Sequence, residues 1–303
     1  MSPMPSSIPA SATTELPPVA RRRSPGFWSD AFRRILKSRA AMSGGIIITL
    51  FVAVAIMAPV LAPYEPLRGR LVERLQAPDA GHWLGTDELG RDVLSRVLYG
   101  ARISLQIQIA AVGLALLLGT ALGVVAGYVG RWPDMLIMRV VDIMMAFPGI
   151  FLALAIIAAL GTGLGNVIIA SAIFLVPQFA RVVRGSVLTL KEKEFVEAAR
   201  ALGEGDVTII TRYLLPNSLA PIIVQTTLRM ATVLLTASGL SFLGLGVQPP
   251  SPEWGAMLSN ARAYMITAPH VATVPGLAIM LVVLGFNLLG DGLRDALDPR
   301  LRE

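Results

Sequence analysis

The sequence contains no cysteine and only two histidines, His82 and His270, among its 303 residues. The missing cysteines exclude a disulfide framework, a thiolate nucleophile and cysteine-ligated zinc, and two distant histidines leave little for a histidine metal site. Charged residues are also scarce, at 15% against roughly 25% in soluble domains. Aromatic residues make up 6% and do not alternate with basic ones, which disfavours a nucleic-acid surface. These shortages point away from a soluble globule.

Apolar residues are abundant and make up 54% of the chain. The 28 glycines and 21 prolines are spread through apolar runs, which is unlike a disordered or a fibrous protein. A helix needs roughly 17 to 25 apolar residues to cross about 30 Å of hydrocarbon, because its backbone groups must bond within the segment. Six stretches qualify, so we predict an all-α integral membrane protein with six transmembrane helices. The stretches are 46–62, 103–129, 143–160, 164–180, 213–247 and 271–290.

Six spans place both termini on one side of the membrane, and the basic residues indicate which side. Outside the spans, 18 lysines and arginines lie on the face that holds the termini and seven lie on the other. The positive-inside rule makes the first face cytoplasmic. We therefore predict an N-terminal tail, a first transmembrane anchor, an extracytoplasmic segment, a five-helix core with a cytoplasmic loop at 181–216, and a C-terminal tail. Their ranges are 1–44, 45–63, 64–102, 103–290 and 291–303.

Several segments carry more specific expectations. Residues 28–39 suit a short amphipathic helix whose basic side chains meet anionic headgroups, and a basic topology signal without a binding role is the alternative. Residues 64–102 are expected to form short helices over the outer mouth. His82 and Asp87 lie near other acids, but a single histidine makes a poor metal site, so we expect an ordered loop there.

Three glycines, Gly119, Gly123 and Gly127, recur at every fourth position within the second predicted span. This spacing places small residues on one helix face, where another backbone can approach closely. We favour packing within this chain over packing against another subunit.

The chain lacks the groups that would power transport by itself. Five of the six spans contain no Asp, Glu, Lys or Arg, whereas ion-coupled carriers need ionisable side chains at membrane depth. No GxxxxGK[ST] phosphate loop is present, so the chain cannot hydrolyse ATP by that route. Energy for uphill transport would then come from a partner docking on the cytoplasmic face. A secondary carrier is the alternative, and a non-transporting scaffold is the third possibility.

The loop between the fourth and fifth spans suits such docking. Phe195, Ala198 or Ala199, and Leu202 recur at helical spacing, so residues 187–202 are predicted to form an amphipathic helix. The same spacing makes these residues the apolar face of the helix.

A sharp turn is expected to follow this helix. Gly203 is expected in a left-handed conformation, and Gly205 follows closely. Asp206 is placed to cap a second short helix from Val207, and Pro216 marks the return into the membrane. Two short helices joined by a turn suit insertion into a groove of a partner.

This loop resembles that of permease subunits of ATP-binding-cassette (ABC) importers, which carries a Glu-Ala-Ala motif, a following glycine and a Leu-Pro pair. The matching residues are Glu197, Ala198, Ala199, Gly203, Leu215 and Pro216. Tyr213 stands where the family commonly has isoleucine, a departure that leaves the docking role in place. Further segments resemble the second permease of dipeptide, oligopeptide and nickel importers, and two of the shorter ones resemble its glutathione-importing branch. The segments are 82–105, 142–156, 240–258 and 284–301, with 227–232 and 268–275 for the glutathione branch.

The resemblance implies a type I ABC importer permease fold in the bacterial inner membrane. It also implies three kinds of partner: a homologous second permease, two ATPase subunits and an extracytoplasmic solute-binding protein. The substrate would be a di- or oligopeptide, with glutathione and nickel as alternatives. This chain would then hold no cofactor and would not be an enzyme, because ATP and Mg²⁺ would bind to the ATPase subunits.

Arg229 is the only charge within the fifth predicted span. A lone arginine at membrane depth faces the protein interior or an aqueous cavity rather than lipid. Two interpretations stay open: Arg229 attracts a peptide carboxylate, or it makes a structural hydrogen bond to backbone carbonyls or to a neighbouring permease.

Overall fold

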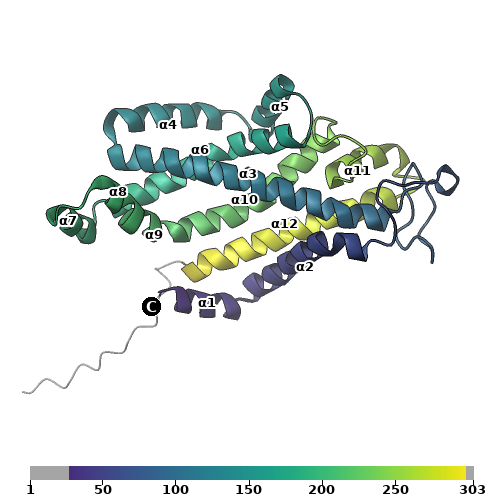
Figure 1. Ribbon diagram of the computed structural model, residues 1–303, viewed down its shortest axis with the longest axis horizontal. Coiled ribbons are helices and arrows are strands. Elements are labelled where there is room, and N and C mark those ends of the chain that lie inside the picture. Colours follow the sequence, from purple (N-terminus) through teal and green to yellow (C-terminus); the bar gives the residue numbers. More distant parts are fainter. Residues whose placement is uncertain (1–26, 298–303) are drawn as a thin grey trace, which may run out of the picture.

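The computed structural model describes residues 27–297, so parts of both predicted tails, 1–26 and 298–303, lie outside the described residues. Helices dominate the described chain (Figure 1). Five of them are long and apolar enough to cross a membrane, and a bent pair of helices, α4 and α5, allows a sixth crossing. This confirms the predicted all-α membrane fold. The five are α2 (Arg39–Leu61), α3 (Val93–Val129), α6 (Leu164–Leu190), α10 (Leu219–Phe242) and α12 (His270–Leu297).

The other elements are shorter and lie mainly at the two ends of the bundle. The α7 and α8 helices lie at one end, and the segment between α2 and α3 lies at the other (Figure 1). The shorter elements are α1 (Phe27–Lys37), η1 (Leu71–Glu73), α4 (Arg131–Ala146), α5 (Gly149–Leu160), α7 (Glu194–Ala201), α8 (Asp206–Thr208), η2 (Ile209–Leu214), α9 (Leu215–Asn217), α11 (Trp254–Ala261) and η3 (Arg262–Tyr264).

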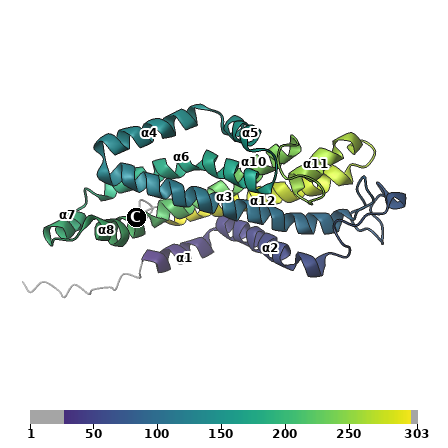
Figure 2. The ribbon, with the colours of Figure 1, turned by 45° about the horizontal axis from the view of Figure 1, so that its top comes forward.

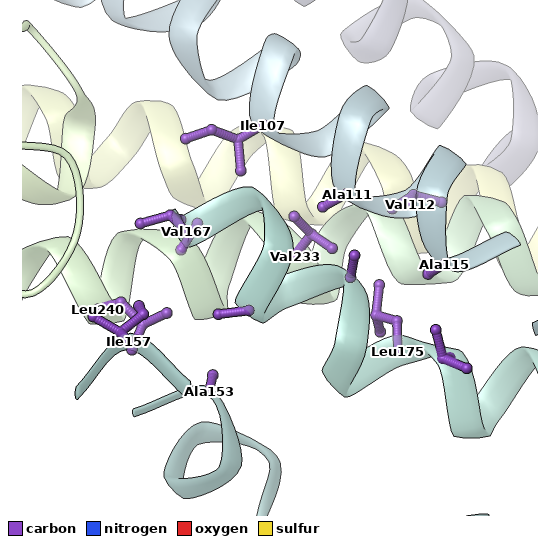
Figure 3. Packing of buried hydrophobic residues seen from close by; sticks show 14 of the residues in the cluster. Ile107, Ala111, Val112, Ala115, Ala153, Ile157, Val167, Leu175, Val233 and Leu240 are labelled. Carbon is purple, nitrogen blue, oxygen red and sulfur yellow. The ribbon is translucent and has the colours of Figure 1, made fainter. Parts of the chain in front are cut away.

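The long helices pack in layers. The α3 helix packs along α6, and α12 packs between α2 and α10. The α4 helix covers α3 and α6 from outside, on the side away from α2 (Figure 2). Aliphatic side chains from α3, α5, α6 and α10 meet in one buried cluster, which Figure 3 shows around Val112, Leu175 and Val233. The bundle thus has an apolar core inside this chain as well as apolar outer faces.

The three glycines of α3 allow α3 and α6 to approach closely. A Cβ atom added at Gly119 would lie 2.5 Å from Cβ of Phe179, and one added at Gly123 would lie 2.6 Å from the Ala180 carbonyl oxygen. One added at Gly127 would lie 2.9 Å from Cβ of Val187. Side chains at these positions would force the two helices apart. The glycine stripe therefore packs within the chain, as the sequence analysis favoured.

The predicted third span, 143–160, is not one helix. The chain bends by 97° between α4 and α5. Phe147 has an extended backbone (φ −90°, ψ 135°) and Pro148 follows it directly. Proline removes a backbone donor and disfavours helical geometry at the residue before it, so the helix ends there. The apolar composition of the stretch concealed this break.

The predicted fifth span, 213–247, is also shorter in the structure. The α10 helix ends at Phe242, and the chain then returns through a loop into α11. Gly244 in this loop has φ +80°, a conformation that glycine adopts readily. Prolines at 249, 250 and 252 keep the loop non-helical until α11 begins at Trp254.

The segment between α2 and α3 is an ordered loop rather than the expected set of short helices. Before α3 begins at Val93 it contains one 3₁₀ turn, η1, and two isolated β-bridges. Its stability comes from polar contacts: Asp87 forms ion pairs with Arg91 at 2.6 Å and with Arg96 at 3.3 Å, all three side chains being buried. Hydrogen bonds to carboxylates, rather than helix periodicity, order this segment.

His82 belongs to the same loop and has acidic neighbours. Its Nδ1 lies 2.9 Å from Asp92 Oδ1, and Asp92 also caps α3 by accepting a hydrogen bond from the Ser95 amide at 2.7 Å. Within residues 27–297, no group of three or more His, Cys, Asp or Glu side chains could hold a metal ion.

Candidate coupling site

The α6 helix extends ten residues beyond its predicted end, and a break separates it from α7. The single helix predicted over 187–202 is therefore wrong, because residues 191–193 interrupt it and Lys193 has an extended backbone (φ −85°, ψ 145°). A straight continuation of α6 would carry the α7 side chains away from the bundle. The break instead turns α7 so that its apolar side chains reach the end of α6.

The buried face of α7 shares only Ala199 with the apolar face predicted from sequence. Val196 and Ala199 are buried against Val183 and Val187 of α6, together with residues of η2. The other predicted residues point outward: Ala198 is exposed, Leu202 is 84% exposed and Phe195 is 39% exposed. Burial of Val196 and Ala199 holds α7 in place, while Leu202 stays free on the surface.

The exposed surface includes the first two residues of the Glu-Ala-Ala motif. Glu197 and Ala198 are exposed, whereas Ala199 is buried beneath them. Val207, in α8, adds an apolar side chain that is 75% exposed. This end of the molecule therefore presents an apolar surface with an acidic residue beside it, which is suited to contact with another protein.

Gly203 forms the turn after α7, and its predicted left-handed conformation is confirmed (φ +82°). The Glu204 amide donates to the Ala199 carbonyl at 3.1 Å, and the Gly203 amide donates to the Arg200 carbonyl at 2.9 Å. This pair of bonds is the Schellman pattern, which ends a helix with a left-handed residue. A Cβ atom at Gly203 would meet nothing within 4 Å, so the backbone angle alone demands glycine here.

The return to the membrane differs from the prediction at Asp206. Asp206 is the first residue of α8 and makes no side-chain cap; instead its carboxylate accepts a hydrogen bond from the hydroxyl of Tyr128. The chain continues through η2, a π-helical segment, into α9, which contains Leu215 and Pro216. Leu215 is half-buried and Pro216 is exposed.

Contacts from α3 to the coupling loop were not predicted from sequence. The α3 helix has 37 residues and is about 56 Å long at 1.5 Å per residue, well beyond the roughly 30 Å of a hydrocarbon core. Near its end, the ring of Tyr128 lies under the Arg200 guanidinium at 5.8 Å, and Lys191 Nζ donates to the Gly127 carbonyl at 3.0 Å. A tyrosine at the end of a predicted span was the only sequence signal.

A further aromatic contact stiffens the loop itself. The rings of Phe195 and Tyr213 stack with centroids 6.4 Å apart, and the Tyr213 hydroxyl donates to Glu204 Oε1 at 3.2 Å. Tyr213, which replaces the isoleucine common in the family, therefore connects α7, the turn and η2.

Two ion pairs join α4 to α6 near the same end. Arg184 donates to both carboxylate oxygens of Asp134, at 2.5 and 2.6 Å, and Arg181 donates to Asp142 at 2.8 Å. The bidentate pair is partly buried and the second pair is exposed. Movement of α6 is thereby linked to α4 as well as to α3.

Arg229 lies away from the coupling loop, within α10, and is half-buried. With the Gln225 amide oriented so that its oxygen faces the guanidinium, Arg229 Nε donates to it at 2.8 Å. This structural hydrogen bond joins two side chains of α10, rather than reaching the backbone carbonyls or the neighbouring permease of the second interpretation, and the guanidinium keeps further donors for a ligand.

Glu253 is a buried acid that the sequence analysis missed because it lies between predicted spans. Only 1% of it is exposed, and its carboxylate accepts hydrogen bonds from the amides of Gly255 at 2.9 Å and Ala256 at 2.8 Å. Burial raises the pKa of Glu253. Its position at the start of α11 makes it a helix cap.

These features describe a helical membrane protein that lacks a phosphate loop and presents a braced, partly apolar loop at one end. Residues 119–303 match the family of binding-protein-dependent transport system inner membrane components. Residues 26–78 match the N-terminal transmembrane domain of oligopeptide transport permease C. The chain therefore belongs to this family of inner-membrane transport components, and it is a permease subunit of an ABC importer rather than an enzyme.

Relatives similar to this chain over nearly its whole length carry related names. The dipeptide transport system permease protein DppC of Alkalihalophilus pseudofirmus is 52% identical over 286 residues, which cover 94% of each chain. The glutathione transport system permease protein GsiD of Pectobacterium atrosepticum is 50% identical over 276 residues, covering 91% of this chain and 92% of that one.

Solved structures show the same fold at lower sequence identity. A chain of the MetNI methionine ABC transporter in an inward-facing conformation aligns with a TM-score of 0.56 and 19% identity, covering 68% of this chain and 97% of that chain. A chain of an amino acid ABC transporter aligns with a TM-score of 0.52 and 14% identity, covering 67% and 94%.

Proposed function

We propose that this chain forms one half of the translocation path of an ATP-driven importer for short peptides, with both termini in the cytoplasm. A homologous second permease forms the other half. Two ABC ATPase subunits bind below and hold the ATP and Mg²⁺, and an extracytoplasmic binding protein delivers the substrate. The charge asymmetry between the two faces of the chain supports this orientation.

The observation that carries the coupling role is the divided surface of α7. Val196 and Ala199 fix the helix to α6, so that Phe195, Ala198 and Leu202 can contact an ATPase without moving relative to the bundle. Glu197 adds a charge for orientation, while Gly203, Leu215 and Pro216 shape the turn and the return. A push on this surface then moves the ends of α6 and α3 together.

Substrate recognition is proposed at the level of chemical class. The relatives named above are dipeptide and glutathione permeases, and both substrates are short peptides with free carboxylates. Arg229 is the candidate for attracting such a carboxylate, because it is the one basic side chain within α10. Import assays with labelled dipeptide and unlabelled glutathione as competitor distinguish the two substrates. Unchanged uptake kinetics in an Arg229→Gln variant would show that Arg229 does not take part in substrate recognition.

Site-specific crosslinking tests the coupling role. Because the chain has no cysteine, Leu202→Cys and Val207→Cys introduce unique thiols at exposed positions of the docking surface. We expect each to crosslink to the ATPase subunit in the assembled transporter. Ile266→Cys, 97% exposed in the segment between η3 and α12, is the matched control and should not. Absence of an ATPase crosslink from both loop positions would refute the proposed docking.

A further inference from the structure

An apolar groove runs along the outside of the bundle between α1 and α2. Its volume is about 700 Å³. Phe32, Ile35 and Leu36 of α1 form one wall, the α2 residues from Ala41 to Ala53 form the other, and Leu289 of α12 contributes to the lining. Thr49 is the only side chain with a polar group among the described residues that line it.

The length of the groove along α2 is close to the thickness of one leaflet of a membrane. From Met42 to Ala53, α2 rises by about 17 Å at 1.5 Å per residue. Half of a typical hydrocarbon core is about 15 Å. The groove leaves room beside Gly45, since a Cβ atom added there would lie 4.0 Å from Cδ1 of Leu289. The dimensions suit one extended acyl chain.

Exposed basic residues are next in sequence to the groove residues of α1 and lie at the start of α2. Arg33 and Lys37 are exposed on α1, and Arg39 is exposed at the first position of α2. None of the described residues lining the groove is acidic. The acidic residues of the last turns of α12, Asp291 and Asp295, do not line it. An apolar trough with a cationic end complements a lipid with an anionic headgroup.

We propose that this groove binds an anionic phospholipid of the cytoplasmic leaflet. An acyl chain lies along α2, and the phosphate lies near Arg33, Lys37 and Arg39. The choice of leaflet rests on the cytoplasmic N-terminus of the proposed function. The lipid fills the angle between α1 and α2 at Ser38, whose hydroxyl accepts a hydrogen bond from the Ala41 amide at 3.3 Å. It thereby holds α1 against the bundle.

Fluorescence quenching by brominated lipids tests this proposal on the full-length chain. Thr49→Cys provides one thiol in the groove for a fluorescent label, because no other cysteine is present. The labelled protein is reconstituted in vesicles of phosphatidylcholine and phosphatidylglycerol, with bromine on the acyl chains of one lipid or of the other. Quenching then reports which lipid occupies the groove.

We expect brominated phosphatidylglycerol to quench beyond its share of the vesicle lipid. Each basic side chain near a membrane contributes about 1 kcal/mol, or about fivefold in binding. The Arg33→Gln/Lys37→Gln double variant should lower the preference by up to about 30-fold, about fivefold for each of the two charges removed. Arg131→Gln/Arg139→Gln removes the same charge from exposed positions of α4 and should leave the preference unchanged. Gly45→Leu should reduce quenching by both lipids, because it fills the groove.

Several outcomes would overturn the proposal. Equal quenching by the two lipids would mean that any bulk lipid fills the groove. Absence of quenching by either lipid would mean that protein covers it. An unchanged preference for phosphatidylglycerol in the Arg33→Gln/Lys37→Gln variant would show that these basic residues do not bind the headgroup. ATP-dependent peptide uptake is measured separately, so its failure alongside a retained lipid preference would count against the proposed function and not against this site.

Discussion

At the scale of single residues, the backbone conformation of Gly203 shapes the loop to which the proposed function assigns the coupling role. Its positive φ angle and the two hydrogen bonds of the turn end α7. The turn points Leu202 outward and begins the return to the membrane. No neighbour lies close enough to exclude a side chain, so any effect of substitution there comes from the backbone.

We predict that Gly203→Val uncouples transport without preventing membrane insertion. A β-branched residue in the left-handed region costs about 1–2 kcal/mol or more, which favours a displaced turn. The measurement is ATP-dependent peptide uptake, normalised to the amount of protein in the membrane. Gly205→Val is the matched control, because Gly205 has an ordinary extended backbone (φ −74°, ψ 158°) and open space around it. Normal uptake by well-expressed Gly203→Val would count against the coupling role of this turn.

Tyr128 is the residue through which α3 holds the loop. Its hydroxyl donates to Asp206 and its ring lies beneath Arg200, so one side chain contacts both α7 and α8. Sequence analysis could not single it out, because its partners are more than 70 positions away along the chain.

We predict that Tyr128→Phe loosens the loop and leaves the bundle intact. The substitution keeps the ring under Arg200 and removes a hydrogen bond worth about 1 kcal/mol, so local opening should rise about fivefold. Hydrogen exchange of residues 203–208 measures this, with exchange in the α10 helix as the internal control. Unchanged exchange at 203–208 would show that the hydroxyl does not brace the loop.

At the scale of elements, the proposed coupling depends on the pairing of α3 with α6, which would carry a push on the loop to the membrane. Both helices pass from the bundle core into the docking end, and the glycine stripe lets their backbones touch. The ion pair between Asp134 and Arg184 adds α4 to the same unit. Because interiors are closely packed, such a unit moves as a body rather than bending.

We predict that Gly123→Leu destabilises the chain strongly, whereas Gly113→Leu does not. A side chain at Gly123 would collide with the α6 backbone, and overpacking of this kind costs about 1–3 kcal/mol or more. A side chain at Gly113, on the same helix, would meet nothing within 4 Å. Thermal unfolding of the two purified variants in one detergent provides the comparison. Similar unfolding temperatures would mean that α3 and α6 tolerate separation.

At the scale of the whole molecule, the coupling loop and the segment between α2 and α3 lie at opposite ends of the bundle (Figure 1). Trp83 and Leu202, one at each end, are 71% and 84% exposed. A bundle with its long helices crossing a membrane must place these two ends in different compartments.

We predict opposite accessibility for single cysteines at these two positions. A membrane-impermeant maleimide added to intact spheroplasts should label Trp83→Cys and should label Leu202→Cys only after permeabilisation, because the basic residues place the loop in the cytoplasm. Labelling of Leu202→Cys in intact cells would reverse the proposed orientation.

Membrane embedding, the helical fold and the left-handed turn at Gly203 could all be predicted from the sequence. The structure confirms the helical fold and the turn, and the match to a family of inner-membrane components supports the membrane location. These properties depend on local composition: apolar runs long enough to span lipid, and a glycine after an amphipathic stretch. The docking role of the Glu-Ala-Ala motif is a prediction of the same kind, which the crosslinking experiment addresses.

Only the tertiary structure decided which side of α7 is buried, where the third span breaks and what holds the loop. The spacing of apolar residues allowed two stripes on α7, and contact with the end of α6 selected Val196 and Ala199 over Phe195 and Leu202. Tyr128, Arg184 and Glu253 acquired their partners only on folding. Composition determines which segments leave water, whereas the choice of contacts among them depends on the packing of helices that are distant in sequence.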